Sequence, residues 1–358
     1  MVPVVLAVGQ ELSSSGQDII LACALGLETV VRLGLATVPS LVVDRGFHET
    51  CIQGVFGAAV ATGKLMGLSV ADLISALGIA GSHASGTREY SHSGGEAKRL
   101  HAGLGAAGGI RGAMLTARGF RGPARILEGS RGVLQAFTDK YSLDAICDGL
   151  GVNWHFMDCG FKPYASCGLI HAPTDALMEL VRRHSLTFEN VDEIVVGIDR
   201  LTMEHCGSLP IQPTDMTGAQ FNLPFSLGMT LVMGGNGFRE YWQLRERAFI
   251  EPRVLAAARK IRLEIDSEAD AAFPKDLIAT VRVRKLDGHV VTQTSRARGS
   301  KDNPLTPGDM RDKFRILMRE TPWQRDTEAV MSAIEQLPTC GTSASVLRPF
   351  ARPSGATA

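Results

Sequence analysis

Glycine and alanine crowd two apolar stretches of this chain, and that feature constrains its fold more than any other. The first stretch is Gly46-Phe-His-Glu-Thr-Cys-Ile-Gln-Gly-Val-Phe-Gly-Ala-Ala59, and the second runs from Lys98 to Arg118. Helices with so few bulky side chains can pack with their backbones close together. Polar residues at the ends of such helices are then held against a confined space. The pattern therefore predicts closely packed helices with a small-molecule site at their ends.

Apolar residues recur every three or four positions over much of the first half of the chain. This spacing predicts helices over residues 17–35, 50–66, 69–82 and 98–118. Ser69 with Asp72 forms a capping-box pattern at the start of one helix. Gly119, followed by Pro123, is a typical end for another. We therefore expect residues 1–157 to form an all-helical domain.

The pattern changes after Asp158. Valine and isoleucine dominate residues 191–198, and residues 277–283 and 289–294 flank a turn at Asp287-Gly288, which predicts a hairpin. Between these strands, helical spacing returns over residues 174–184, 225–233 and 252–261. Alternation of this kind is typical of an α+β domain with an antiparallel sheet.

The expected domain organisation follows from these patterns. Residues 158–302 should form a smaller α+β lid domain, and residues 303–347 should rejoin the helical domain. The tail, residues 348–358, has little with which to bury itself and is expected to be disordered. The predicted fold class is thus mainly α with an α+β second domain.

Charge and composition exclude several classes of protein. The chain has 358 residues, and its 37 lysines and arginines balance 37 aspartates and glutamates. Without a run of like charges, a nucleic-acid partner is not expected. The seven cysteines are odd in number and lack zinc-ligand spacing, which favours reduced thiols in a cytoplasmic protein. The sequence also lacks the patterns typical of a signal peptide, a membrane span or a catalytic metal site, so none of these is expected.

His48 follows Gly46-Phe47 at the mouth of a predicted helix. Backbone N–H groups and the helix dipole at such a position favour a bound carboxylate. Histidine also titrates near neutral pH, so it suits proton transfer. The alternative is a histidine that only hydrogen-bonds a nearby carbonyl group.

Lys98, Arg99 and His101 stand at the start of a helix that is otherwise made of glycine, alanine and leucine. Cations at a helix N-terminus oppose the dipole, so they destabilise the helix unless a bound anion offsets them. This conflict argues for a functional site, and a solvated basic turn is an equally weighted alternative. Further candidates come from the preceding polar loop, which contains His83, Arg88, Tyr90 and His92.

The third polar cluster begins at Lys162, which precedes a proline and is therefore expected in extended backbone. Cys167 and His171 follow a short distance downstream. A thiol nucleophile at Cys167 is a remote alternative, because histidine four residues after cysteine matches no hydrolase motif.

Short motifs spread over nearly the whole chain are specific as a set, although none is specific alone. They are Ser15-Gly16, Gly26-Leu-Glu28, Arg32-Leu-Gly34, Gly46-Phe-His-Glu-Thr50, Gly57-Ala-Ala59, Lys64-Leu-Met-Gly-Leu68, Ala76-Leu-Gly-Ile-Ala-Gly-Ser82, Lys98-Arg-Leu-His-Ala-Gly103, Leu127-Glu-Gly129, Lys162-Pro-Tyr-Ala-Ser-Cys167 with His171, Gly299-Ser-Lys-Asp-Asn-Pro304 and Lys313-Phe314. In this set the chain resembles the MmgE/PrpD family, which includes 2-methylcitrate dehydratase, cis-aconitate decarboxylase and iminodisuccinate epimerase.

The resemblance implies a large helical domain, a smaller lid domain, a homodimer, and a site between the domains without a metal or cofactor. It implies catalytic roles for His48, Lys98 and Lys162. Two lysines would hold the carboxylates of a small polycarboxylate substrate, while the histidine moves a proton next to one of them. The other residues that we expect to bind substrate are His101, Arg88, Tyr90, Cys167 and His171.

The chain departs from the family pattern in two respects. The family carries a further segment before the point where this chain begins, with an Asp-Asp-bearing helix and a histidine before a Pro-Gly turn. In addition, Cys167 and Phe225 stand where the decarboxylases have histidine and tyrosine, which argues against decarboxylation. The sequence therefore favours an activity like that of 2-methylcitrate dehydratase. The alternatives are an epimerase like iminodisuccinate epimerase, or a truncated, inactive relative that serves as a dimeric binding protein.

Overall fold

The computed structural model describes residues 1–347, which form two compact units. Unit 1 comprises Met1–Arg88, Ala97–Asp158 and the chain from Thr321 onward, and unit 2 comprises Glu89–Glu96 and Cys159–Glu320. Residues 348–358, for which a disordered tail is predicted, lie outside the described residues. The fold is mainly α, with an α+β second unit.

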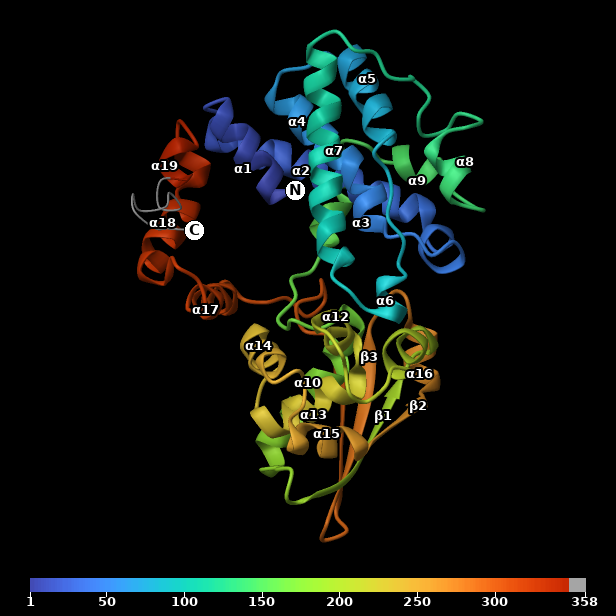
Figure 1. Cartoon of the computed structure of the whole chain (residues 1–358), viewed down its shortest axis with the longest axis vertical. Helices are drawn as coiled ribbons and strands as arrows, with labels where there is room; N and C mark the ends of the chain where they lie inside the picture. The colour runs from blue at the N-terminus through green and yellow to red at the C-terminus, as the bar shows by residue number, and fades with distance from the viewer. Residues whose placement is uncertain (348–358) are drawn as a thin grey trace. The chain divides into compact units, whose positions relative to one another are not determined.

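Within residues 1–347, the regular elements of unit 1 are all helices, joined by loops and one isolated β-bridge (Figure 1). Its elements are α1 (Val2–Glu11), α2 (Gly16–Thr37), η1 (Ser40–Asp44), α3 (Glu49–Ile52), α4 (Gly54–Leu65), α5 (Val70–Gly81), α7 (Ala97–Ala117), α8 (Val133–Phe137), α9 (Asp144–Cys147), η2 (His155–Asp158), η5 (Gln324–Asp326), α18 (Thr327–Glu335), η6 (Leu337–Thr339) and α19 (Ala344–Leu347). The helices that were predicted from apolar spacing are confirmed as α2, α3 with α4, α5 and α7.

Small residues set the distance between the central helices of unit 1. A Cβ atom on Gly57 of α4 would lie 2.6 Å from the carbonyl oxygen of Gly26 in α2. A Cβ atom on Gly109 of α7 would lie 2.4 Å from the carbonyl oxygen of Val55 in α4. Both distances are too short for any side chain, so these three helices pack backbone to backbone, as the glycine-rich sequence predicts.

The first helix of this core, α2, has the length and hydropathy that a membrane span would need, and it is the one such helix among residues 1–347. It packs against α1 and α4 in unit 1. It also carries a buried ion pair, with Nε of Arg32 2.6 Å from Oε1 of Glu28. Because charges of this kind are costly in lipid, α2 has the character of a core helix of this unit.

The C-terminal segment is tied to the first helices of the chain. The backbone N–H of Gly16 donates to the carbonyl oxygen of Cys340, and the Ser343 hydroxyl donates to that of Gly9, both at 3.0 Å. In Figure 1, α18 and α19 (red) accordingly belong to the same unit as α1 (dark blue). Within residues 1–347, the rejoining segment therefore starts at Thr321.

Unit 2 combines helices with one four-stranded sheet. Its elements are α6 (Tyr90–Ser93), η3 (Gly168–Ile170), α10 (His171–His184), β1 (Val191–Ile198), α11 (Arg200–Thr202), η4 (Met203–Gly207), α12 (Met216–Phe221), α13 (Leu223–Met233), α14 (Phe238–Glu246), α15 (Pro252–Arg259), β2 (Ile261–Ile265), α16 (Ser267–Ala272), β3 (Ile278–Lys285), β4 (Val290–Arg296) and α17 (Pro307–Met318).

The sheet has the order β2-β1-β3-β4 and is mixed, which corrects the prediction of an antiparallel sheet. The hairpin β3–β4 and the pair β1–β3 are antiparallel as expected, but β1 and β2 are parallel, with Val196 opposite Leu263. The parallel strand was missed because the helical spacing over residues 252–261 runs directly into the short alternating sequence of β2. Parallel neighbours need a long crossover, which α11 to α15 supply.

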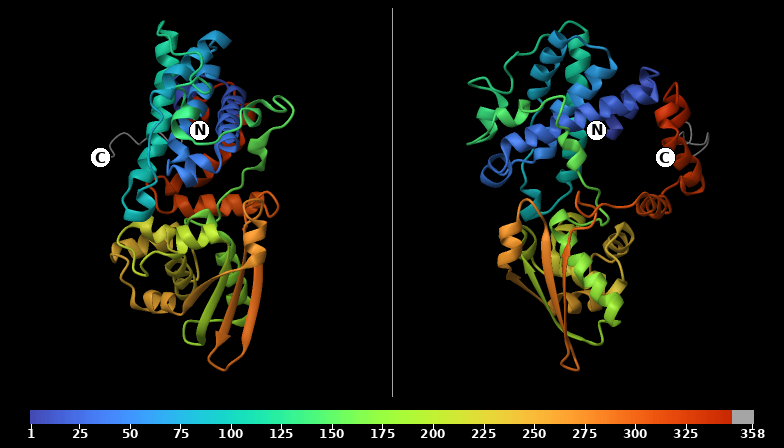
Figure 2. Two further views of the ribbon diagram at one scale, coloured as in Figure 1. Left: turned by 90° about the vertical axis from the view of Figure 1, so that its right-hand side faces the viewer. Right: turned by 180° about the vertical axis from the view of Figure 1, so that it is seen from behind.

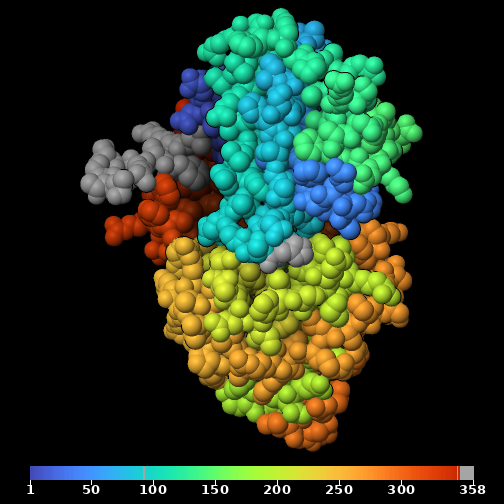
Figure 3. All heavy atoms as spheres, turned by 45° about the vertical axis from the view of Figure 1, so that its right-hand side comes forward, coloured from blue at the N-terminus to red at the C-terminus, as the bar shows by residue number. Residues whose placement is uncertain are grey.

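Helices cover one face of this sheet. Figure 2 shows α10 (green) and α13 to α15 (yellow) on the same side of the strands. Alternate residues of β3, such as Val281 and Val283, are buried against this layer together with Leu177 and Leu180 of α10. In Figure 3, the β3–β4 turn (orange) lies at the surface of unit 2, beside the chain that precedes β1 (yellow-green). A backbone hydrogen bond joins the two, since the Leu286 N–H donates to the Asn190 carbonyl oxygen.

Two segments fall in unit 2, although the sequence placed them in the helical domain. The first is residues 89–96, where the backbone N–H and C=O of Gly95 bond the side chains of Asp215 and Thr217. The second is α17, where Arg298 pairs with Asp309 and Lys313 donates to the carbonyl oxygen of Lys162. These side-chain contacts join residues distant in sequence, and apolar spacing carries no information about them.

Candidate functional site

Two short backbone segments of unit 1 lie side by side and position His48. Phe47 and Thr87 form an antiparallel bridge, and the His48 N–H donates to the carbonyl oxygen of Gly86 at 3.0 Å. The Arg88 N–H donates in turn to the carbonyl oxygen of Gly46 at 2.8 Å. His48 is the N-cap residue of α3, but its side chain does not cap that helix. The imidazole is therefore available for other contacts.

The imidazole rings of His48 and His101 face each other through matching nitrogens. The two Nδ1 atoms lie 3.0 Å apart, and the residues are only 3% and 9% exposed. A hydrogen bond between two such nitrogens requires one to carry a proton and the other to accept it. Gly86 packs against this pair: a Cβ atom there would lie 3.1 Å from the His101 ring, and its φ is +103°. Glycine is therefore the residue that fits this position.

Two cations, Lys98 and Arg88, lie near these histidines. We call His48, His101, Lys98 and Arg88 the histidine cluster. Lys98 lies in the first turn of α7, as predicted. Burial, followed by the charges of His101, Lys98 and Arg88, lowers the pKa of His48 to about 4. The ring is therefore neutral near neutral pH and can accept a proton. A bound carboxylate would offset the nearby positive charges and make His48 a stronger base.

A second group of basic side chains lies in unit 2, and we call Lys162, Ser166, His171 and Lys313 the lysine cluster. The Nζ of Lys162 and the Nε2 of His171 each lie 3.4 Å from the carbonyl oxygen of Ser166. Lys313 donates to the carbonyl oxygen of Lys162. Burial and the charge of Lys162 lower the pKa of both His171, to about 4, and Lys313. Positive charge thus converges here, which suits a bound anion.

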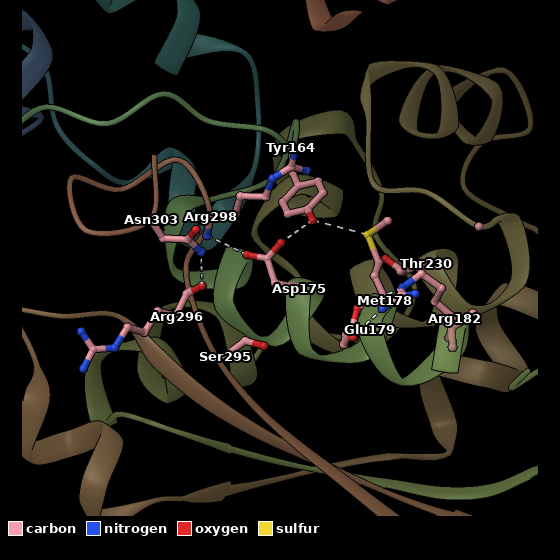
Figure 4. Close-up of a pocket in the computed structure, with 12 residues that line it drawn as sticks. Tyr164, Asp175, Met178, Glu179, Arg182, Thr230, Ser295, Arg296, Arg298 and Asn303 are labelled. Carbon is pink, nitrogen blue, oxygen red and sulfur yellow. Dashed lines mark hydrogen bonds and ion pairs between the residues drawn. The ribbon is translucent and has the colours of Figure 1, made fainter. Parts of the chain in front are cut away.

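Tyr164 links this cluster to a polar cavity of about 580 Å³ in unit 2, shown in Figure 4. Its ring contacts that of His171 edge to face, with centroids 5.3 Å apart. Its hydroxyl donates to Asp175 at 2.5 Å, and the other oxygen of Asp175 accepts the backbone N–H of Arg298 at 2.7 Å. Burial raises the pKa of both Tyr164 and Asp175. Both oxygens of Asp175 are thus engaged, one by the Tyr164 hydroxyl and one by the Arg298 N–H. Since the Tyr164 ring in turn contacts His171, we interpret this network as support that holds the His171 ring in place.

Two of the predicted site residues are used in packing. Tyr90 is 6% exposed, and its ring lies edge to face with Phe221 in the core of unit 2. Cys167 is partly buried against the same core, and its backbone N–H donates to the carbonyl oxygen of Gln220. That Tyr90 and Cys167 also bind substrate stays a prediction.

The described residues offer no group of three or more His, Cys, Asp or Glu side chains that could hold a metal ion. The charged and titratable side chains of the two clusters are those of lysine, arginine and histidine.

Comparison with family models places both parts of the chain in one family. Residues 1–145 match the MmgE/PrpD N-terminal domain, and residues 164–336 match the MmgE/PrpD C-terminal domain. The chain belongs to the MmgE/PrpD family. Its similarity to curated relatives agrees with this assignment. A cis-aconitate decarboxylase from Aspergillus terreus (strain NIH 2624 / FGSC A1156) is 30% identical over 338 residues, which cover 88% of this chain and 68% of the relative.

Mammalian relatives are more distant but match a similar length. The cis-aconitate decarboxylase of Mus musculus is 25% identical over 94% of this chain and 70% of its own length. That of Homo sapiens is 26% identical over 88% of this chain and 66% of its own length. The MmgE/PrpD chain described here thus spans about two thirds of the relatives that it matches.

Sequence reasoning missed two features of these clusters in the MmgE/PrpD chain. Lys313 was seen only as part of a motif, although it contacts the backbone of Lys162. Gly86 was not singled out, although it packs against His101. A partly buried lysine in a helix and a glycine in a polar loop are ordinary features, so only the family motif could have pointed to Lys313.

We expect the protein to lose stability as the pH falls from about 6.5 to about 4. His48 and His171 both have pKa values lowered from 6.5 to about 4 in the folded state. In this window the unfolded chain binds more protons than the folded one, so stability falls with falling pH. Asp175, with its raised pKa, opposes the trend near the acidic end.

Thermal unfolding midpoints measured between pH 7 and pH 4 test this expectation. Replacing His171 by asparagine should flatten the dependence, whereas the same change at the exposed His184 should leave it unaltered. Equal dependence in all three proteins would contradict the role assigned to buried histidine.

Proposed function

We propose that this chain is a lyase that moves a proton at a carbon atom next to a carboxylate of a small polycarboxylic acid. The observation that carries the proposal is the buried, neutral His48, held by His101 and surrounded by Lys98 and Arg88. A neutral imidazole can accept a proton once an anionic substrate offsets the charges of the neighbouring cations, and those cations in turn bind the substrate's carboxylates. The chain belongs to the MmgE/PrpD family and is similar to proteins named cis-aconitate decarboxylases, which supports a lyase.

In this proposal His48 is the base, and the lysines bind and orient the substrate. Lys98 would hold one carboxylate and so stabilise the negative charge that develops when the adjacent carbon loses its proton. Lys162 would bind a further carboxylate, with His171 beside it. That both clusters serve one substrate stays a prediction.

Dehydration of 2-methylcitrate is the finer activity that we propose first. Loss of a proton next to a carboxylate, followed by loss of a β-hydroxyl group, gives an alkene and water. The residue at position 225 agrees with this choice. It is a phenylalanine and so lacks the hydroxyl group of a tyrosine, and it is fully buried and packs against Phe249. An epimerase would share the first step and return the proton to the opposite face.

Decarboxylation of cis-aconitate is the second candidate, because all the relatives named above are cis-aconitate decarboxylases. That reaction also needs a proton at a carbon next to a carboxylate, delivered after CO₂ has left. The histidine cluster could supply it in the reverse direction.

The remaining parts of the proposal concern assembly and location. We propose a homodimer in the cytoplasm that needs no metal or cofactor and binds neither nucleic acid nor membrane. The balanced charge argues against a nucleic-acid partner. The cysteines, which lack zinc-ligand spacing, are consistent with reduced thiols in the cytoplasm. Light scattering of the purified protein measures the oligomeric state directly.

Proton NMR in heavy water tests the reaction. The purified chain is incubated with citrate, 2-methylcitrate, cis-aconitate and an aspartate-derived imine, while the α-proton signal is followed. Exchange with a new alkene signal supports dehydration, exchange without one supports epimerisation, and CO₂ release from cis-aconitate supports decarboxylation. The proposal fails if no acid exchanges a proton or loses CO₂, and the inactive binding protein then becomes the better hypothesis.

A further inference from the structure

We infer that His101 is a positioning residue that holds His48 in the tautomer with its proton on Nδ1. This inference rests on the proposed function, in which His48 is the base. It changes the role expected for His101, which the sequence analysis placed among the substrate-binding residues. It also fixes which nitrogen atom of His48 exchanges a proton with the substrate.

The geometry restricts the possible tautomers to two. The Nδ1 atoms of the two rings are 3.0 Å apart, so a single proton lies between them. If His48 donates, its Nε2 carries the lone pair of a base. If His101 donates, His48 must keep its proton on Nε2 and can act only as a hydrogen-bond donor. A base at His48 therefore requires that His48 donates and His101 accepts.

The surrounding residues hold the two imidazole rings close together. The backbone N–H of His48 donates to the Gly86 carbonyl oxygen, and a Cβ atom on Gly86 would lie 3.1 Å from the His101 ring, a tight contact at a position whose φ of +103° already favours glycine. Both residues are buried, at 3% and 9% exposure. Because both rings are buried and Gly86 packs closely against His101, the Nδ1 contact belongs to the packed interior of unit 1 and is not an incidental surface approach.

The proton balance is simple. The electron pair of the substrate's C–H bond stays on carbon, and the proton moves to Nε2 of His48. The ring becomes an imidazolium, which keeps its Nδ1–H and donates it to Nδ1 of His101. The acceptor thus stabilises the charged form as it appears, in the way that the acceptor in a catalytic triad does. Returning the proton restores the neutral pair.

Long-range ¹⁵N–¹H NMR of the imidazole rings at pH 7 tests the inference without any substrate. The spectrum of the ¹⁵N-labelled protein contains nine histidines, and the variant His48→Asn identifies the signals of His48. We expect a protonated Nδ1 and an unprotonated Nε2 on His48. A protonated Nε2 on His48 overturns the inference.

Two variants of matched size separate positioning from packing. In His101→Asn, the amide oxygen takes the place of Nδ1 and still accepts a hydrogen bond. In His101→Leu, a side chain of similar shape accepts none. We expect His48 to keep the Nδ1–H tautomer in the asparagine variant and to change to the Nε2–H tautomer in the leucine variant. The same tautomer in both variants would contradict a role for the acceptor.

Activity gives a second, separable readout. With a substrate that exchanges its α-proton, we expect kcat to fall roughly 10²-fold in His101→Leu and much less in His101→Asn, with KM little changed in either. A rise of KM alone would mark His101 as a substrate-binding residue and overturn the inference. If no acid reacts but the NMR result holds, the proposed function fails while the tautomer assignment stands.

Discussion

Replacing His48 by asparagine will lower the rate of α-proton exchange by about 10²- to 10⁴-fold, which is the range for loss of a positioned general base. The asparagine amide can still donate a hydrogen bond to Nδ1 of His101, so the buried contact is kept. It cannot accept a proton from carbon. The measurement is NMR exchange in heavy water with the acid that proves most reactive in the unaltered protein.

A matched control and a stability measurement make this result interpretable. His289, in the exposed turn before β4, receives the same substitution and should leave the exchange rate unchanged. The thermal midpoint of His48→Asn should stay close to that of the unaltered protein at pH 7, because the hydrogen bond and most of the volume are retained. Full activity in His48→Asn would move the base to another residue, whereas a collapsed midpoint would show that His48 is structural.

Local patterns predicted most of the fold. The glycine-rich stretches gave helices that pack backbone to backbone, and Ser69 caps α5, with its hydroxyl accepting the Asp72 N–H at 3.2 Å. Both features depend on residues near in sequence or on the size of a side chain. The strand β2 was missed because five residues directly after a helix carry too short an alternation to be separated from it.

The site was predicted less completely, since its contacts join residues far apart in the chain. His48 and His101 were each singled out for chemistry, but the 3.0 Å contact between them follows from the packing of α7 against α3 and α4. The contact of Lys313 with the Lys162 carbonyl likewise depends on where α17 lies in unit 2. Residue type can identify candidates, whereas the pairing that decides their protonation comes only from three-dimensional structure.

The buried ion pair of α2 leads to the largest effect on stability that we expect. Besides Glu28, the guanidinium of Arg32 reaches three carbonyl groups, those of Ile146, Asp148 and Asn153, at 2.7 to 3.1 Å. The second oxygen of Glu28 accepts the backbone N–H of Phe156 at 2.9 Å. The pair therefore holds α9 and the segment after it against α2, beside an apolar cavity of about 460 Å³.

Replacing Arg32 by methionine should lower the free energy of unfolding by about 3–5 kcal/mol, because it leaves the Glu28 carboxylate and three carbonyl groups buried without their partner. Urea unfolding followed by circular dichroism measures the loss. The control is Arg45→Met, which removes an exposed ion pair with Asp139 and should cost at most about 1 kcal/mol.

A double-mutant cycle shows whether the buried charge is the cause. If it is, adding Glu28→Gln to Arg32→Met should recover part of the lost stability, since the unpaired carboxylate is gone although the carbonyl groups still lack their donor. If instead the two losses simply add, the arginine stabilises the unit through its carbonyl contacts, and Glu28 is only an additional acceptor for it and for Phe156. Coupling between the two substitutions would therefore show that charge pairing stabilises this segment of unit 1, whereas additivity would show that the carbonyl contacts of Arg32 do so.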